Sequence, residues 1–391
     1  YGNDGLRLSI FRGEVFPHYR ENADDKSFHT DENIDLPLDD PFFDIDFDQE
    51  GYEKEKAVAQ RNGQLWLAKK ASEQYHADKL IFSTWSAPAY MKSNGNVSGG
   101  SLPSKNYQTY ADYLADFCDA YKAAGLNVYA VSPANEPEYP ATWNSCVWWP
   151  QKSTLGKFIA NYMAPTFAAR HPEVKIIFGE NAQWNRIYSL VPGTGSKDNV
   201  AAMLEGNSAL AGYPVIAAGH GYTQPKTNVY PTIEPFTAAE EKGIPVWLTE
   251  VSGPDYAFDA SMADGLKWAK LFHRYLVDAH VGAIIWWAGA LPDGGTNEGL
   301  IFTDKDRVTY STTKRFETFG HFSRYIPVGS TRITAEKGNS LPSDVLVSSY
   351  KKGNQFTVVA INPTGSEVSG ELVLAGAEVN GNLQQAVTDA D

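Results

Sequence analysis

Short apolar runs that end at polar residues recur along most of the chain. These runs are rich in β-branched and aromatic residues, which predicts buried strands. We expect strands to begin near residues 6, 79, 127, 174, 215, 246 and 282, and helical patterns such as 107–124 and 260–280 lie between them. Strand and helix alternating at intervals of roughly thirty to fifty residues are typical of the α/β class, here a parallel (β/α)8 TIM barrel.

The strand count leaves one strand of a barrel unassigned. Seven runs are found, whereas a closed barrel of this kind has about eight strands. Either the acidic insertion 13–60 contains the eighth, or the first strand is absent from the given chain. Because the run GLRLSIFR at 5–12 starts abruptly, we favour the second interpretation.

The pattern changes near residue 331. Two β-rich runs, 345–350 and 356–362, are joined by a hairpin-type turn, Lys352-Gly353-Asn354. We therefore expect a catalytic barrel in residues 1–325 and a partial side β domain, an antiparallel β-sandwich, in residues 326–391.

Two glutamates follow hydrophobic strands that lie far apart in the sequence. The run from Val128 leads to Asn135-Glu136-Pro137, and the run from Ile244 ends at Glu250. Functional groups of barrels lie at the carboxyl ends of strands. Hydrolysis of a glycosidic bond needs one carboxyl group to protonate the leaving oxygen and a second one at the anomeric carbon. We expect Glu136 to be the acid, Glu250 the nucleophile, and Asn135 to bind the sugar 2-hydroxyl.

Other strand ends supply further candidates for substrate binding. Arg12 is either a surface charge or a clamp on an active-site carboxylate, and its place at a strand end favours the clamp. Trp85 precedes a proline-stiffened loop and is either a sugar-stacking platform or a rim-packing residue. His220 and Tyr222 could orient Glu250, although His220 alone could be structural. Four more aromatic candidates lie beyond predicted strands: Tyr139, Trp143, Trp286 and Trp287.

Composition narrows the class of partner. The net charge of −14 argues against nucleic acids and anionic membranes. Aromatic residues make up 13% of the chain, more than a core of this size needs, and flat rings suit the apolar faces of sugars. No apolar run approaches eighteen residues. The expected partner is a polysaccharide, bound by a monomer.

Signals for metals, cofactors and processing are weak. The acidic alternation at Asp44, Asp46 and Asp48 lacks the glycine and distal glutamate of a calcium loop, so we predict no metal and no cofactor. Cys118 and Cys146 either form one disulfide or are two buried thiols. No signal peptide is visible in the given chain; we nevertheless expect a secreted protein whose signal could have preceded Tyr1.

Taken together, the motifs resemble glycoside hydrolase family 30 of clan A, and in particular its xylanase branch. The matching stretches are LRLSIFR, FSTWSAPAYMKSNG, VYAVSPANEPEY, GHGYT, WLTEV, IIWW and RFETFGHFSRYIPVGSTRI. The resemblance implies a (β/α)8 barrel with a side β domain, Glu136 as acid/base, Glu250 as nucleophile, and β-1,4-xylan as substrate. It also implies an additional amino-terminal segment that carries the first strand, so both ends of the given chain are expected to be short.

One stretch departs from the family pattern. Family members that require glucuronic acid branches carry an arginine just after the last barrel strand. Here the stretch Trp286–Gly295 reads WWAGALPDGG and contains Asp293 but no arginine. Since a guanidinium grips a carboxylate in a bidentate manner, we expect a xylanase that does not depend on glucuronate.

Two alternatives stay open. One is another activity of the same family, a β-1,6-glucanase or β-1,6-galactanase, because the catalytic pair is shared. The other is a carbohydrate-binding protein without catalysis, against which the intact pair of glutamates argues.

Overall fold

The computed structural model describes residues 1–2, 5–20, 22–24, 63–188, 200–223, 232–292, 296–304, 309–376 and 383–390. The chain divides into two compact units. Unit 2 contains Ser9–Val251 and Val281–Ile285, and unit 1 contains Tyr1–Leu8, Ser252–His280 and Trp286–Asp391. This division differs from the expected boundary at 325/326.

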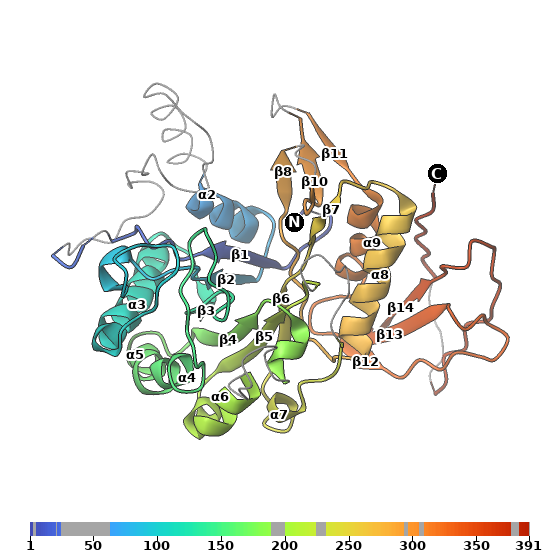
Figure 1. The fold of residues 1–391 in the computed structure, drawn as a ribbon. Helices are drawn as coiled ribbons and strands as arrows, with labels where there is room; N and C mark the ends of the chain where they lie inside the picture. The colour runs from blue at the N-terminus through green and yellow to red at the C-terminus, as the bar shows by residue number, and fades with distance from the viewer. Residues whose placement is uncertain are drawn as a thin grey trace. The chain divides into compact units, whose positions relative to one another are not determined.

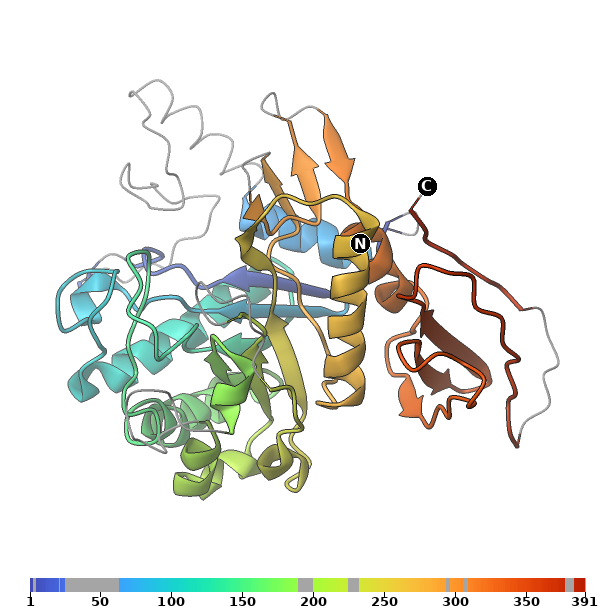
Figure 2. The same ribbon diagram turned by 45° about the vertical axis from the view of Figure 1, so that its right-hand side comes forward.

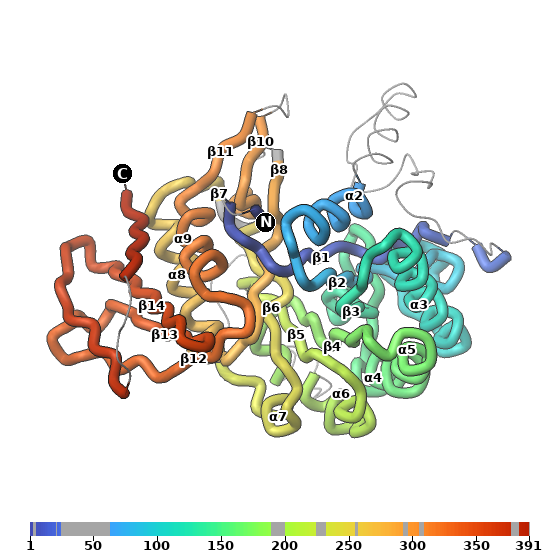
Figure 3. The backbone as a smooth tube through the Cα atoms, turned by 180° about the vertical axis from the view of Figure 1, so that it is seen from behind, coloured from blue at the N-terminus to red at the C-terminus, as the bar shows by residue number. Residues whose placement is uncertain are grey.

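Unit 2 is built on a curved parallel sheet with its strands in sequence order. Its six strands within the described residues are β1 (Ile10–Glu14), β2 (Lys79–Ser83), β3 (Val128–Ser132), β4 (Lys175–Asn181), β5 (Val215–His220) and β6 (Val246–Glu250). A parallel bridge between Leu248 and Ile284 adds the segment expected near residue 282. The sheet curls with helices along its outside (Figure 1, Figure 3). This is the arrangement of consecutive βα units in a (β/α)8 barrel.

The helices of unit 2 follow the predicted alternation. They are α2 (Gln64–Lys69), α3 (Tyr107–Ala123), α4 (Leu155–Phe158), α5 (Ala164–Arg170), α6 (Val200–Gly206) and α7 (Thr237–Glu240). In α3, Phe117 and Tyr121 lie one turn apart and both rings contact Phe82 of β2, with centroids 4.8 Å away. The helix ends before Gly125, whose φ of +86° provides the left-handed turn expected there.

Both faces of the parallel sheet are covered. Side chains of alternate strand positions form one buried cluster on the inner face: Ile81, Ala130, Ile177, Ile216, Ala218 and Trp247. Phe82, the next residue after Ile81, points to the helix side, where it packs on α3. Burial on two faces explains why these strands read as nearly continuous apolar runs.

The first strand lies later in the chain than predicted. We expected it in residues 5–12, but β1 spans Ile10–Glu14 and pairs in parallel with Lys79–Ser83. Arg7 has a φ of +53°, which interrupts an extended run. Pairing with β2 therefore sets the strand, and Arg12 lies at its centre.

Unit 1 combines helices with small sheets. Helices α8 (Met262–Val277) and α9 (Lys314–Ser323) pack side by side (Figure 1, Figure 2). A three-stranded antiparallel sheet contains β12 (Thr331–Ile333), β13 (Leu346–Lys352) and β14 (Gln355–Ile361), and α8 contacts β13 and β14. The turn between β13 and β14 contains Gly353 with a φ of +57°, as the predicted hairpin requires. The full sandwich stays a prediction.

Shorter strands complete unit 1. Strands β8 (Ala290–Pro292), β10 (Ile301–Thr303) and β11 (Tyr310–Thr312) form one sheet, and β7 (Gly253–Ala257) pairs with β9 (Thr296–Asn297).

A buried ion pair of 2.5 Å joins Arg315 of α9 to Asp264 of α8. This pair ties the two helices of unit 1 together.

Two other features bear on expectations from the sequence. Cys118 and Cys146 are unpaired and buried, which is the second of the two alternatives for these residues. Among the described residues, none of the helices has the length and apolar character needed to cross a membrane. Asp44, Asp46, Asp48 and Asp293 lie outside the described residues.

Candidate active site

The strands of unit 2 bring five charged side chains to one end of the sheet. Arg12 comes from β1, Glu180 from β4, His220 from the last position of β5 and Glu250 from the last position of β6, while Glu136 follows β3. Arg12 and Glu250 are 238 positions apart in the sequence, yet their side chains are bonded. Parallel strands in sequence order place their carboxyl ends at the same edge, and this produces the cluster.

Arg12 contacts carboxylates, as expected, although it lies at the centre of β1 and not at a strand end. Its Nη1 donates to Oε2 of Glu250 at 2.6 Å, and its Nη2 donates to Oδ1 of Asn135 at 2.9 Å and to Oε1 of Glu180 at 3.3 Å. The guanidinium also lies 5.0 Å from the ring centroid of Trp85. With its side chain only 5% exposed, Arg12 is a buried cation shared by two carboxylates.

Glu250 is held through both of its oxygens. Arg12 binds Oε2, and the hydroxyl of Tyr222 donates to Oε1 at 2.7 Å. These two hydrogen bonds fix the orientation of the carboxylate. The expectation that Tyr222 orients Glu250 agrees with this contact.

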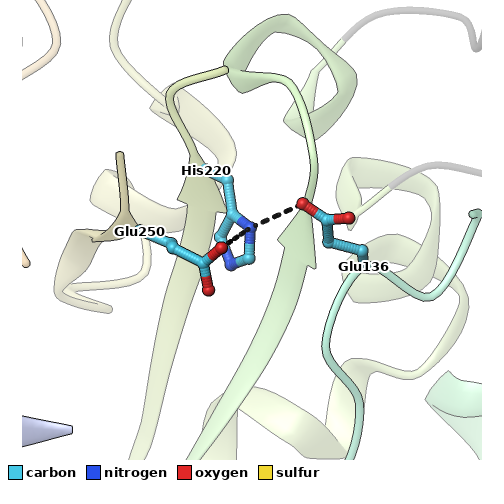
Figure 4. A group of neighbouring side chains, drawn as sticks. All are labelled: Glu136, His220 and Glu250. Carbon is cyan, nitrogen blue, oxygen red and sulfur yellow. Dashed lines mark hydrogen bonds and ion pairs between the residues drawn. The ribbon is translucent and has the colours of Figure 1, made fainter. Parts of the chain in front are cut away.

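His220 is surrounded by three glutamates. Its Nδ1 lies 3.1 Å from Oε1 of Glu136 and 3.9 Å from Oε1 of Glu250, and Figure 4 shows these three side chains together. Its Nε2 lies 3.8 Å from Oε1 of Glu180. Burial acts to lower the pKa of the imidazole, but the three carboxylates outweigh it and raise the pKa to about 10. The ring is therefore a cation at neutral pH. Its shortest contact is with Glu136, whereas we expected it to orient Glu250.

The surroundings of Glu136 raise its pKa, which suits a general acid. Burial raises its pKa above that of an ordinary glutamate; His220 opposes this shift, while the negative charges of Glu250 and Glu138 add to it. Its φ is +43°, an uncommon value for a residue with a side chain, and its backbone N–H donates to the carbonyl of Glu180 at 3.0 Å. The neighbouring Asn135 accepts from Arg12 through its amide oxygen. Its contact with a sugar hydroxyl stays a prediction.

Glu180 is the site residue that the sequence analysis did not select. Its side chain is fully buried and accepts a hydrogen bond of 2.5 Å from the Ser83 hydroxyl, in addition to the contact with Arg12. Burial would raise its pKa, but Arg12 and His220 outweigh burial and hold the pKa well below the ordinary value. The available signal was its position two residues after the run 174–178, just as Glu250 lies two residues after Leu248.

The aromatic candidates lie in three different settings. Tyr139 and Trp143, just beyond Glu136, are each 42% exposed and their ring centroids lie 6.0 Å apart, so they present an open aromatic surface in unit 2. Trp85 is only 7% exposed and lies against Arg12. Trp286 and Trp287 belong to unit 1, where Trp286 is buried against Trp268 with centroids 4.6 Å apart. Sugar binding by these residues stays a prediction.

The same cluster could be considered for a metal ion. Ligand atoms of Glu136, His220 and Glu250 all lie within 4.8 Å of one another. A metal would need a lone pair of His220, but this ring is protonated at neutral pH and its charge is balanced by carboxylates. The arrangement therefore suits proton transfer and nucleophilic attack better than metal binding.

Comparison with known proteins finds relatives that align with most of this chain. The glucuronoxylanase XynC of Bacillus subtilis is 26% identical over 81% of this chain and 67% of its own length. The endo-1,6-β-D-glucanase BGN16.3 of Trichoderma harzianum is 23% identical over 78% of this chain and 62% of its own length. The chain thus spans about two thirds of the length of these relatives.

A solved structure has the same fold. The catalytic domain of GH30 xylanase C from Talaromyces cellulolyticus superposes with a TM-score of 0.70, covering 91% of this chain and 75% of that one at 23% identity. The family model described as O-glycosyl hydrolase family 30 matches residues 39–301, which is more than half of the chain. The chain therefore belongs to glycoside hydrolase family 30.

Proposed function

We propose that the protein is a retaining glycoside hydrolase that cleaves β-1,4-xylan by double displacement and does not depend on glucuronic acid branches. One observation carries the mechanism: carboxyl oxygens of Glu136 and Glu250 lie within 4.8 Å of each other. In retaining enzymes the two carboxyl groups are about 5 to 5.5 Å apart, whereas inverting enzymes leave about 6.5 to 9.5 Å for a water molecule. The short separation supports retention.

In the first step, Glu136 donates its proton to the glycosidic oxygen while a carboxylate oxygen of Glu250 attacks the anomeric carbon. The bond between that carbon and the leaving oxygen breaks, and an ester of Glu250 forms. Arg12 and Tyr222 hold Glu250 in place for the attack. The raised pKa of Glu136 favours the protonated form that this step requires.

In the second step, Glu136 removes a proton from water, whose oxygen attacks the anomeric carbon and releases Glu250. The ester carries no charge, so the repulsion that Glu250 exerts on ionised Glu136 disappears. The pKa of Glu136 should therefore fall in the intermediate, and this lets the same residue act as a base. Two inversions at one carbon give net retention.

The substrate is inferred from the family motifs and from relatives whose names state xylanase activity. The B. subtilis relative is named a glucuronoxylanase, but the stretch 286–295 of this chain has no arginine to bind a uronate. We expect equal rates on xylan with and without glucuronic acid branches. Strict dependence on the uronate would contradict this part of the proposal.

A β-1,6-glucanase is the second candidate, supported by the T. harzianum relative. Digestion of β-1,4-xylan, β-1,6-glucan and β-1,6-galactan with sized products separates these activities. Proton NMR of the first products tests retention, because an inverted anomer would refute double displacement. Glu136→Gln and Glu250→Gln should bind the polymer without cleaving it, whereas a parent protein that binds but never cleaves would be a carbohydrate-binding protein.

A polymeric substrate lies outside cells, so we further propose that the protein acts as a secreted monomer. Activity in the culture medium of the native host tests secretion, and light scattering at micromolar concentration tests the monomer. Activity confined to the cell, or a mass of twice 43.0 kDa, would contradict these two points.

A further inference from the structure

We propose that Glu180 is a positioning residue of this reaction: its carboxylate fixes Arg12 and His220, the two cations that hold Glu250 and Glu136. This inference rests on the proposed glycosidase function, since it assigns a role within that site. Glu180 is not one of the two expected catalytic glutamates, Glu136 and Glu250.

The contacts of Glu180 link it to both halves of the site. Its Oε1 accepts from Arg12 at 3.3 Å and lies 3.8 Å from Nε2 of His220. Arg12 in turn binds Glu250, and the other ring nitrogen of His220 contacts Glu136. One carboxylate thus contacts both cations, each through a nitrogen other than the one nearest Glu250 or Glu136.

The protein delivers this carboxylate through a special turn at the end of β4. Glu180 has a φ of +51° and the preceding Gly179 has a φ of +103°. A Cβ at Gly179 would lie 2.4 Å from the carbonyl oxygen of Ala218, so only glycine fits there. A non-glycine residue held at positive φ is an uncommon and strained arrangement, which structures retain mostly at functional positions.

Charge balance gives Glu180 a physical role. Before the first step Glu136 is protonated, and the two anions Glu180 and Glu250 balance the two cations Arg12 and His220. In the ester intermediate Glu250 is neutral and Glu136 is ionised, so the two anions Glu136 and Glu180 balance the same cations. Glu180 therefore keeps the cluster neutral in both states, in a site where an unbalanced buried charge is costly.

Removing the negative charge of Glu180 should lower the pKa of Glu136. Glu180→Gln keeps the backbone contact to Glu136 and a side-chain acceptor for Ser83, but the cluster acquires one net positive charge. Removing an anion from the cluster makes Glu136 lose its proton at lower pH, because nearby charges shift a carboxyl group by roughly one to three pH units. The other titratable or charged groups near the cluster, the neutral Tyr222 and the Glu138–Arg186 pair, are unchanged.

The test is the pH profile of kcat/KM on the polymer that the protein cleaves. Glu180→Gln should move the alkaline limb to lower pH by roughly one unit, which lowers kcat/KM about tenfold on that limb. Glu180→Asp keeps the charge and should keep the limb of the wild type. A limb that is unchanged or moves upward in Glu180→Gln overturns the proposal.

A matched control separates positioning from stability. Asp264→Asn removes a buried carboxylate from another arginine, Arg315, and none of the contacts of Asp264 involves Glu136, His220 or Glu250. This variant should lower the melting temperature as Glu180→Gln does, without moving the pH profile. A profile that moves equally in the control would show that loss of stability is the cause and would overturn the proposal.

A second measurement needs neither catalysis nor the Glu180→Gln variant. In ¹⁵N-labelled wild-type protein, His220 held by Glu180 and Glu136 should carry both ring protons at pH 8; the His220→Gln spectrum assigns its signals. A neutral ring at pH 8 overturns the inference. Absence of hydrolysis in the wild type would instead refute the proposed function, so the two failures are distinguishable.

Discussion

Replacing Arg12 by glutamine tests the charge cluster most directly. The variant removes a buried cation that is bonded to Glu250 at 2.6 Å and Glu180 at 3.3 Å, and leaves both carboxylates in place. Breaking a buried ion pair from one side costs about 3 to 5 kcal/mol, because the remaining charge stays buried without compensation. We expect the free energy of unfolding to fall by about this amount at pH 7.

The stability lost in Arg12→Gln should become smaller as the pH falls. Arg12 and His220 hold the pKa of Glu180 below its unfolded value of about 4.3, so the stabilisation by Glu180 is present above that pH and is lost as pH falls. In Arg12→Gln, the cation that opposes the effect of burial is gone, so the pKa of Glu180 rises. The folded variant then binds a proton that the folded wild type does not. The difference in the free energy of unfolding between wild type and variant therefore narrows by up to about 1.4 kcal/mol per pH unit on acidification.

Urea denaturation followed by tryptophan fluorescence at pH 7 and pH 4 measures this gap. Arg170→Gln is the control, since Arg170 also bonds two carboxylates, Asp116 and Asp119, but is 32% exposed. An exposed pair contributes about 0 to 1 kcal/mol. The reasoning is refuted if Arg12→Gln costs no more than Arg170→Gln at pH 7, or if its cost is the same at both pH values.

Three further predictions concern catalysis. Glu136→Gln should lower kcat on xylan by a factor of about 10² to 10⁴. Because burial raises the pKa of Glu136, the alkaline limb of the wild-type pH–rate profile should lie above the ordinary glutamate pKa of about 4.3. A limb at about 4.3 would contradict the assignment of Glu136 as the acid. Tyr222→Phe removes a hydrogen bond to a charged oxygen, worth about 1.5 to 3 kcal/mol, so kcat/KM should fall roughly 10- to 150-fold; an unchanged rate would exclude Tyr222 as the orienting group. Trp143→Ala removes half of an exposed ring pair and should raise KM for the polymer several-fold at constant kcat, whereas a fall in kcat alone would speak against a binding surface.

Much of the barrel could be predicted because strand formation leaves a local pattern. Strands expected near 79, 127, 174, 215 and 246 begin at Lys79, Val128, Lys175, Val215 and Val246. Apolar residues that are buried on both faces make continuous runs, and polar residues follow where the strand reaches the edge of the sheet. The first strand was placed too early, because its limits depend on pairing with β2 and not on its own apolar residues.

The site could be predicted only in part for the same reason. Glu136 and Glu250 stand out because each follows a strand whose carboxyl end is expected to carry function. Glu180 has an equivalent position, but nothing in its local sequence distinguishes a buried partner of Arg12 from a solvated strand end. Trp286 was selected from its strand end as well; it packs against Trp268 in unit 1, and its role in sugar binding stays a prediction.

The order of residues was enough to predict a barrel and the two glutamates, because these follow from short-range patterns of apolar and polar positions. The family resemblance came from matching motifs. It did not reveal that three carboxylates and two cations form one balanced cluster. That cluster joins side chains up to 238 positions apart, and its protonation depends on burial and on distances of a few ångströms. Coulomb interactions act through space and not along the chain, so folding had to bring these groups together before their chemistry could be derived.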